Sequence, residues 1–281
     1  MEPISEAVKI VSAVNSSLPE QSTMTSTRTS QHECRMCADT GYQGWKTPHA
    51  GYSMTECIFC ECATGQRVLE YWQRKSVAKK QADMEKLFVG ACIPAHFRSF
   101  TLDSIRQRAV NEPDKKAAID AVEQWITAGY VEDPATKRYK SGLVLAGDYG
   151  RGKTGTLTPA IRHSLEQGKS GLWIEVTDFV GVIQSGYRDG TSLERLEAAQ
   201  KVDVILLDDL GDKSRDGAET DDRRRIIYQL VNYRHNNGLP MLITTNLNGQ
   251  QMAAQFGGRT VERIMESCAW VSMGGRNLRR E

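Results

Sequence analysis

One eight-residue stretch constrains the fold of this chain more than any other feature. Its residues are Gly147, Asp148, Tyr149, Gly150, Arg151, Gly152, Lys153 and Thr154. The stretch follows the apolar run Leu143–Ala146. Glycines let backbone N–H groups curl around phosphate oxygens, and the N-terminus of a following helix adds positive partial charge. Lys153 is placed to neutralise the β- and γ-phosphates and the Thr154 hydroxyl to coordinate Mg²⁺. We therefore predict a phosphate-binding loop rather than an ordinary glycine-rich turn.

Two further polar positions follow apolar runs. Asp208 and Asp209 end the run that begins at Val202, and Asn246 follows Met241–Thr245. Behind a phosphate-binding loop, Asp208 is expected to reach Mg²⁺ directly or through water, and Asp209 to polarise the attacking water. An amide at Asn246 can hold that water against the γ-phosphate. Without the loop, these residues would more often cap a helix or form a turn, so their assignment depends on the fold.

The pattern after residue 91 predicts an α/β fold. Five apolar runs read as buried strands: Gly142–Ala146, Gly171–Val176, Val202–Leu207, Pro240–Thr244 and Ala269–Met273. Helix-like stretches lie between them, near 153–167, 178–186, 191–200, 220–237 and 248–256. Short strands that alternate with helices indicate a mostly parallel sheet covered on both faces. Pro159 lies inside the first of these helices, so that helix is expected to bend or to begin irregularly.

Several segments of this region follow the patterns of one family. They are Cys92–Phe100 (G-I-P-x-x-[FY]-R…F), Leu206–Gly211 (L-D-D-L-G), Tyr233–Leu247 (R-Y…P…T-S-N-L), Gly258–Ile264 (G-E-R-x-x-S-R-L) and Trp270–Arg279. Residues 91–281 thereby resemble the AAA+ helicase-loader and transposition-accessory ATPases, the DnaC/DnaI and IstB-like group. The resemblance implies a P-loop ATPase domain with a five-stranded parallel sheet flanked by helices. It also implies that ATP and Mg²⁺ are the cofactors.

The resemblance assigns roles to residues that spacing alone does not. Arg263 matches the arginine finger, which reaches the phosphate bound by a neighbouring subunit, with Arg259 as the alternative. Arg279 stands where a sensor 2-type arginine contacts the nucleotide. An arginine finger implies that the protein self-associates into a ring, spiral or filament. Asp209 is one methylene shorter than the glutamate of many relatives, and Gly155–Pro159 replaces an apolar helix start, so both departures bear on the rate of hydrolysis.

Five cysteines near the N-terminus predict a zinc site. They are Cys34, Cys37, Cys57, Cys60 and Cys62, arranged as C-x-x-C, nineteen residues, then C-x-x-C-x-C. Zinc takes four ligands, so one of these five is not needed. Knuckle geometry favours Cys57 with Cys60, whereas the C-x-C pattern of the loader family favours Cys60 with Cys62. No thioredoxin-like strand surrounds either pair, so a structural metal is favoured over a redox role.

These features divide the chain into four expected parts. Residues 1–31 are polar enough to form a flexible segment, with apolar spacing at its start that is compatible with a short helix. Residues 32–63 form the cysteine-rich zinc-binding module, and residues 64–90 form a charged connecting helix. The ATPase domain covers 91–281.

Composition and charge limit where the chain acts. The formal net charge is +1, so any DNA contact must come from local patches, for which Arg223–Arg225 and the C-terminal residues Arg276, Arg279 and Arg280 are candidates. No run approaches the length needed to span a bilayer, and the start lacks the pattern of a secretory signal. We expect a cytoplasmic protein of a bacterial cell, encoded by the host or by a phage, with no membrane partner.

Three functions are compatible with these residues. The first is an ATP-dependent loader that delivers a replicative DNA helicase onto single-stranded DNA, its zinc module holding the helicase. The second is a transposition regulator of the IstB type that binds DNA and recruits a transposase. The third is a zinc-ribbon adaptor with a nucleotide switch. The N-terminal zinc module favours the first of these functions.

Overall fold

The computed structural model describes residues 33–46, 56–110, 112–211 and 221–278. The chain divides into two compact units, residues 1–83 and 84–281. The division falls inside the long helix α2 (Ala63–Gly90), where the charged segment predicted a helix. Within the described residues, no helix is both long and apolar enough to cross a membrane.

The N-terminal unit contains a small antiparallel hairpin. Its strands are β1 (Tyr42–Lys46) and β2 (Glu56–Phe59). The Tyr42 and Phe59 rings lie 5.5 Å apart, and Trp72 in α2 donates a 2.7 Å hydrogen bond from Nε1 to the Tyr42 hydroxyl. The hairpin is therefore fixed to the first turns of α2.

The second unit is built on a five-stranded parallel sheet. The strands are β5 (Gly142–Ala146), β6 (Gly171–Glu175), β7 (Val204–Asp208), β8 (Met241–Thr245) and β9 (Cys268–Ser272). They lie in the order β6-β7-β8-β5-β9. The predicted α/β fold is confirmed, and each predicted strand agrees with the observed one to within two residues.

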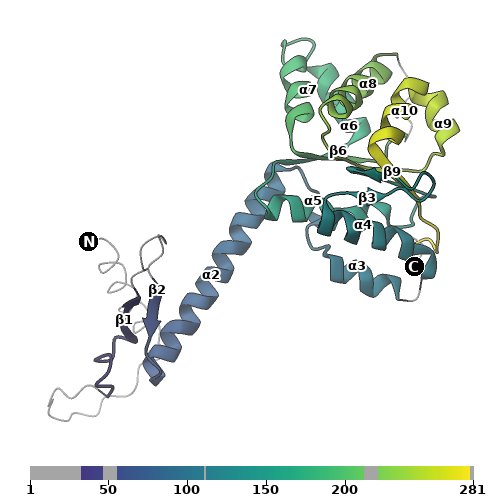
Figure 1. Ribbon diagram of the computed structural model, residues 1–281. Helices are drawn as coiled ribbons and strands as arrows, with labels where there is room; N and C mark the ends of the chain where they lie inside the picture. The colour runs from purple at the N-terminus through teal and green to yellow at the C-terminus, as the bar shows by residue number, and fades with distance from the viewer. Residues whose placement is uncertain (1–32, 47–55, 111, 212–220, 279–281) are drawn as a thin grey trace. The chain divides into compact units, whose positions relative to one another are not determined.

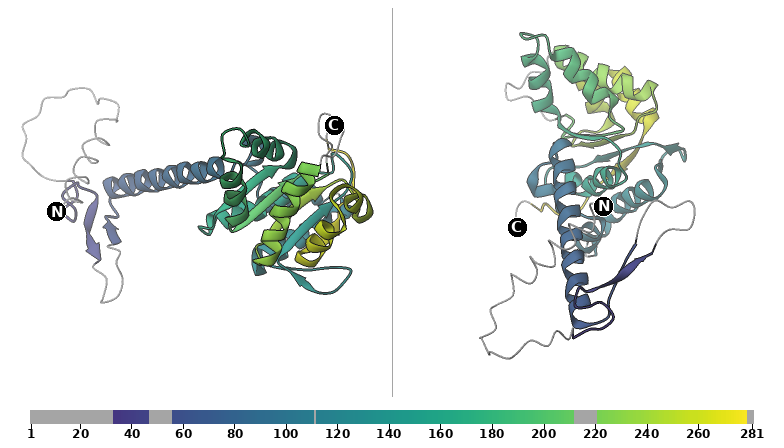
Figure 2. Two further views of the ribbon diagram at one scale, coloured as in Figure 1. Left: turned by 90° about the horizontal axis from the view of Figure 1, so that it is seen from above. Right: turned by 90° about the vertical axis from the view of Figure 1, so that its left-hand side faces the viewer.

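Helices cover both faces of this sheet (Figures 1 and 2). One face carries α3 (Leu102–Ala109), α4 (Lys116–Ala128) and α5 (Lys153–Glu166). The other carries α6 (Val176–Ser185), α7 (Ser192–Lys201), α8 (Asp221–Asn236), α9 (Gly249–Phe256) and α10 (Gly258–Ser267). Side chains alternate along each strand, so Leu143 and Leu145 enter the first core while Val144 and Ala146 enter the second. Both faces of the central strands are therefore apolar, which explains their continuous apolar runs.

Short elements complete the unit. They are the 3₁₀ turns η1 (Ala95–Phe97) and η2 (Pro113–Lys115) and the hairpin of β3 (Val131–Glu132) and β4 (Tyr139–Lys140). Helix α5 continues through Pro159. A Cβ on Gly155 would lie only 2.5 Å from Cε1 of Phe100, so a larger residue would displace that ring. The absence of a side chain at Gly155 thus lets the segment after η1 pack directly on α5.

Arg234 of α8 is a structural residue. Its guanidinium is fully buried and donates to the carbonyl oxygens of Ala199, Gln200, Val202, Asp203 and Pro240, at distances between 2.9 and 3.4 Å. Burial lowers the pKa of Arg234 to about 10, which leaves it charged at neutral pH. This one side chain ties together the loops that lead into β7 and β8, and thereby fixes where these two strands begin.

Candidate functional site

The glycine-rich loop joins β5 to α5 at the carboxyl edge of the sheet. Gly150 and Gly152 have φ values of +76° and +89°, in the left-handed region that favours glycine. A Cβ on Gly147 would lie 2.2 Å from the Met273 carbonyl oxygen, so this position also requires glycine. No side chain caps the first N–H groups of α5, which begins at Lys153. The loop and helix start therefore offer backbone donors to an anion.

Lys153 is almost fully buried, with 5% of its surface exposed. Its ammonium group donates to the carbonyl oxygens of Gly147 and Asp148 at 2.8 and 3.0 Å. The Arg151 guanidinium pairs with the Asp148 carboxylate at 2.9 Å. The Lys153 ammonium group therefore bonds to the carbonyl oxygens of its own loop. A bound triphosphate would replace these carbonyl oxygens as its partner.

Asp208 connects the loop to the neighbouring strands. Its Oδ1 accepts hydrogen bonds from the Thr154 hydroxyl at 2.8 Å and from the Thr244 hydroxyl at 2.6 Å. Burial raises the pKa of Asp208, and these two donors oppose the rise. The hydroxyl and the carboxylate predicted to hold Mg²⁺ therefore lie together, with oxygen ligands of the type that this ion prefers.

Asp209 adopts an unusual backbone conformation. Its φ is +51°, and its N–H donates a 2.8 Å hydrogen bond to the Thr244 hydroxyl. The next residue is fixed as well, because the Leu210 N–H donates to the Thr244 carbonyl oxygen at 2.9 Å. Thr244 thereby holds the backbone that aims Asp209 into the pocket beside the loop.

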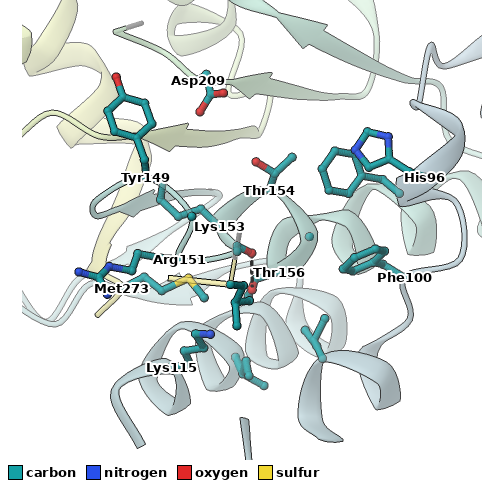
Figure 3. Close-up of a pocket in the computed structure, with 17 residues that line it drawn as sticks. His96, Phe100, Lys115, Tyr149, Arg151, Lys153, Thr154, Thr156, Asp209 and Met273 are labelled. Carbon is teal, nitrogen blue, oxygen red and sulfur yellow. Dashed lines mark hydrogen bonds between the residues drawn. The ribbon is translucent and has the colours of Figure 1, made fainter. Parts of the chain in front are cut away.

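A pocket of about 280 Å³ lies between the loop and the segment that contains η1. Figure 3 shows Tyr149 and Asp209 on one side of it and Lys115 on the opposite side. The aromatic rings that line it belong to His96, Phe97, Phe100 and Tyr149. The loop end offers an ammonium group, a hydroxyl and backbone N–H groups, whereas the far end is largely apolar. This division suits a nucleotide, which has a charged phosphate tail and a flat base.

The last described residues run beside the loop. The Met273 N–H donates to the Ala146 carbonyl oxygen at 2.7 Å, and the Leu278 N–H donates to the Gly150 carbonyl oxygen at 2.8 Å. Arg276 pairs with Glu112 at 3.1 Å, and Glu112 pairs with Lys115 at 2.6 Å. These ion pairs hold the pKa of the buried Glu112 carboxylate low, mainly through Lys115.

The other predicted residues that the structure describes do not line this pocket. Asn246 follows β8 directly and is half-buried, but it does not line the pocket. Arg263 lies on α10, where its guanidinium sits 5.2 Å from the centre of the Tyr228 ring. Arg259, at the start of α10, lines a different surface pocket. Arg279 and Arg280 lie outside the described residues.

The predicted DNA contact through Arg223–Arg225 is wrong for Arg223. Arg223 is only 2% exposed, because it lies on the face of α8 that packs on the sheet together with Ile226 and Ile227. Arg225 is paired with Asp222 at 2.6 Å. Of the three consecutive arginines, Arg223 is therefore unsuited to contacting phosphates, whereas Arg224 and Arg225 are exposed.

Four of the five N-terminal cysteines form a cluster. The Sγ atoms of Cys34, Cys37, Cys60 and Cys62 all lie within 4.8 Å of one another. The distances between Cys34 and Cys60 and between Cys37 and Cys62 are both 3.6 Å. A tetrahedral zinc site with Zn–S bonds of about 2.3 Å has sulfur–sulfur distances of about 3.8 Å. The cluster therefore has the size that a Cys₄ zinc site needs.

The cluster is supported by its surroundings. The Gly65 N–H lies 3.4 Å from the Cys62 sulfur, and the Gln43 amide nitrogen lies 3.6 Å from the Cys60 sulfur. Burial raises the pKa of the Cys37 thiol to about 12, so a cation would be needed to hold it as a thiolate at neutral pH. Cys57 lies in β2, opposite Trp45. Its side chain is outside the described residues.

Two residues of the nucleotide site were missed in the sequence. Thr244 looked like an ordinary strand residue, yet it contacts both aspartates of the site. Glu175 ends β6 in register with Asp208. Burial and the nearby Asp178, Asp209 and Asp208 raise the pKa of Glu175 to about 7. The sequence shows Glu175 at the end of an apolar run. That Glu175 lies beside Asp208 depends on the pairing of β6 with β7, which the sequence does not show.

The fold and this site define an AAA+ ATP-binding domain. The model of the IstB-like ATP-binding proteins matches residues 107–281. The chain therefore belongs to the IstB-like ATP-binding family, which includes the DnaC/DnaI helicase loaders. The predicted resemblance is confirmed at this level.

Named relatives are similar over part of their length. The replicative helicase loader DnaI of Bacillus subtilis is 24% identical over 188 residues, which are 63% of this chain and 58% of DnaI. The replicative helicase loader DnaC of Escherichia coli K12 is 28% identical over 134 residues, 47% of this chain and 53% of DnaC. The chain thus spans little more than half the length of these relatives. A crystal structure of the DnaC helicase loader superposes with a TM-score of 0.54 at 20% identity, covering 64% of this chain and all of that one.

Proposed function

We propose that this protein is an ATP-dependent loader that delivers a replicative DNA helicase onto single-stranded DNA. The observation that carries the ATP-dependent part is the hydrogen bond of 2.8 Å between Thr154 and Asp208, which joins the phosphate-binding loop to the acidic strand end. The loading part is supported by the similarity to DnaI and DnaC, which are named as replicative helicase loaders.

In this proposal the residues of the pocket bind and orient ATP. The loop N–H groups and Lys153 hold the phosphates, and Thr154 with Asp208 would hold Mg²⁺, which neutralises phosphate charge when bound. Asp209 accepts a proton from the attacking water, or polarises it, while Asn246 orients that water. Arg279 contacts the nucleotide from the C-terminal segment, whose preceding residues already follow the loop.

Hydrolysis would require a second copy of the chain. Arg263 is absent from the residues that line the pocket of its own subunit, and it lies on α10, on the opposite face of the sheet from α5. This placement suits a residue that reaches the phosphates bound by a neighbour. We therefore assign Arg263 as the arginine finger of a self-associated ring, spiral or filament, with Arg259 as the alternative.

The four-cysteine cluster would bind one structural zinc ion. Cys34, Cys37, Cys60 and Cys62 are four soft ligands at tetrahedral spacing, which selects Zn²⁺ over the hard ion of the nucleotide site. The N-terminal unit is small, so zinc would supply much of its folding free energy. We assign this unit to helicase binding.

The full-length chain and the replicative helicase of the same cell provide the test. The tagged protein should retain the helicase on affinity resin, and Cys34→Ser/Cys37→Ser should not, while that variant still binds ATP. An Arg263→Ala variant should retain the helicase and bind ATP but neither assemble nor hydrolyse it. If the wild-type protein fails to retain the helicase in any nucleotide state, the loader proposal is wrong.

A second candidate is a transposition regulator that binds DNA and recruits a transposase. The match of the IstB-like model over residues 107–281 favours it. The cysteine cluster lies outside residues 107–281, so the match of this model does not use the cluster to distinguish the two candidates. Retention of a transposase encoded beside this chain, and not of the helicase, would favour the second candidate.

A further inference from the structure

The hairpin of β3 and β4 carries two exposed tyrosines that are not part of the nucleotide site. Residues 130–140, called here the tyrosine hairpin, lie between α4 and β5 in the chain, and Asp133 contacts the edge strand β9. None of these residues lines the pocket beside the phosphate-binding loop. Figure 1 shows β3 close to the edge strand β9.

The tyrosine hairpin is held rigidly by Asp133. One carboxylate oxygen of this buried residue accepts from the N–H groups of Ala135 and Thr136 at 3.1 and 2.7 Å and from the Thr136 hydroxyl at 2.9 Å. The other accepts from the Trp270 N–H in β9 at 3.1 Å. Val131 is buried in the core beneath. These contacts fix the turn and its position on the sheet edge.

Two tyrosines of this hairpin point to solvent. Tyr130 is 44% exposed and Tyr139 is 65% exposed, and their rings meet edge to face with centres 5.0 Å apart. The core of the hairpin is already supplied by Val131, so the rings are not needed to fill it. A fixed aromatic pair of this kind offers a surface on which an unpaired base can stack, because every base has a π-face.

Basic side chains surround the two rings. Lys137 and Arg138 are exposed in the turn, and Lys140 donates to the Glu266 carbonyl oxygen at 2.8 Å, which leaves its charge uncompensated by that bond. Lys137 lies 3.7 Å from the exposed Glu132, a separation and exposure at which an ion pair is weak. Among the described residues, Arg138 has no acidic partner. The positive charge beside the rings complements a phosphate backbone.

We propose that the tyrosine hairpin binds single-stranded nucleic acid, with Tyr130 and Tyr139 stacking on bases and Lys137 and Arg138 contacting phosphates. The inference rests on the proposed loading function and specifies a surface for its DNA. Because no residue of the hairpin lines the nucleotide pocket, this contact needs no ATP. Duplex DNA fits it less well, since paired bases keep their faces stacked within the helix.

Fluorescence anisotropy of the full-length protein with labelled oligo(dT) tests the proposal. Tyr130→Ala/Tyr139→Ala should weaken binding by about fivefold or more for each stacked base, whereas Tyr130→Phe/Tyr139→Phe keeps the rings and should bind as the wild type does. Lys137→Gln/Arg138→Gln should lower the slope of log K against log salt by about 1.4, since each phosphate contact of a single strand contributes about 0.7.

Controls separate this surface from general effects. Lys116→Gln/Lys201→Gln removes the same charge from residues already paired with Asp120 and Glu197, and it should leave binding unchanged. All variants should hydrolyse ATP normally and unfold at the wild-type temperature. If the wild type binds no single strand, the DNA part of the proposed function fails with this inference. If the wild type binds and the tyrosine and charge variants bind equally well, only this inference is wrong. Loss of self-association without loss of DNA binding would identify a protein interface instead.

Discussion

Thr244 provides a sharp test of how the nucleotide site is built. Its hydroxyl is fully buried, donates to the Asp208 carboxylate at 2.6 Å and accepts from the Asp209 N–H at 2.8 Å. Thr244→Val keeps the shape of the side chain but removes both hydrogen bonds. It leaves a buried N–H without its acceptor and removes one of the two donors to Asp208.

The size of the effect follows from these two bonds. A hydrogen bond to a charged group contributes about 1.5–3 kcal/mol and a neutral one about 0.5–1.5 kcal/mol, so the free energy of unfolding should fall by about 2–4 kcal/mol. Thr244→Ser keeps the hydroxyl and loses only a buried methyl group, which costs about 1 kcal/mol. The difference between the two variants isolates the hydrogen bonds.

Catalysis should separate the two variants more clearly than stability. In the valine variant, Asp209 loses the contact that holds its left-handed backbone, so kcat for ATP should fall by about tenfold to a hundredfold. ATP affinity should change little, because Lys153 and the loop are untouched. Steady-state ATPase assays and urea unfolding measure both quantities. Equal kcat and equal stability of the valine and serine variants would refute this account of Thr244.

The other predictions concern ligand binding and pH. Lys153→Ala should abolish ATP binding in a fluorescent-nucleotide assay, whereas Asp209→Ala should bind ATP and not turn it over; normal binding by the lysine variant would exclude the phosphate-binding loop. Metal analysis should find about one zinc ion per chain in Cys57→Ser and none in Cys62→Ser; the reverse result would mean that Cys57 is the fourth ligand. Burial raises the pKa of Asp208, so its charged form destabilises the fold above that pKa. Asp208→Asn should therefore unfold at a higher temperature than the wild type at neutral pH, and the gap should close as the pH falls through the raised pKa; a less stable variant at neutral pH would contradict this.

The nucleotide-binding fold could be predicted because its buried strands have a simple sequence pattern. Strands buried on both faces appear as continuous apolar runs such as Val204–Leu207, and the phosphate-binding loop fixes which run precedes it. The carboxyl ends of parallel strands meet at one edge of the sheet, which brought Asp208 at the end of β7 to Thr154 in the segment that follows β5. Thr244 could not be singled out in this way, since a threonine is common in any strand.

The choice among cysteines depended on packing that spacing does not encode. Both pairings predicted from the sequence contained Cys60, and the structure brings Cys62 into the cluster. Cys57 precedes the end of β2, whereas Cys60 and Cys62 follow that strand at the turn into α2. The antiparallel pairing of β1 with β2 returns the chain to the start of β1, beside Cys34 and Cys37, which a count of intervening residues does not reveal.

The burial of Arg223 could have been predicted from the helical spacing of its neighbours in the sequence. Arg223 lies three and four residues before Ile226 and Ile227, and this spacing places all three on one face of a helix. Reading the arginines as a charge run ignored that periodicity. The helical pattern, once applied, buries Arg223 and leaves Arg224 exposed.

The central claim is that this chain loads a replicative helicase in an ATP-dependent manner. The most direct measurement counts helicase molecules bound to closed circular single-stranded DNA, isolated by gel filtration after incubation with the full-length protein and ATP. A closed circle excludes threading over an end, so the helicase ring must be opened or assembled around the strand. We predict a clear gain of bound helicase with the wild-type protein and none with Lys153→Ala. Equal amounts of bound helicase with the wild type, with Lys153→Ala and without either protein would contradict the claim.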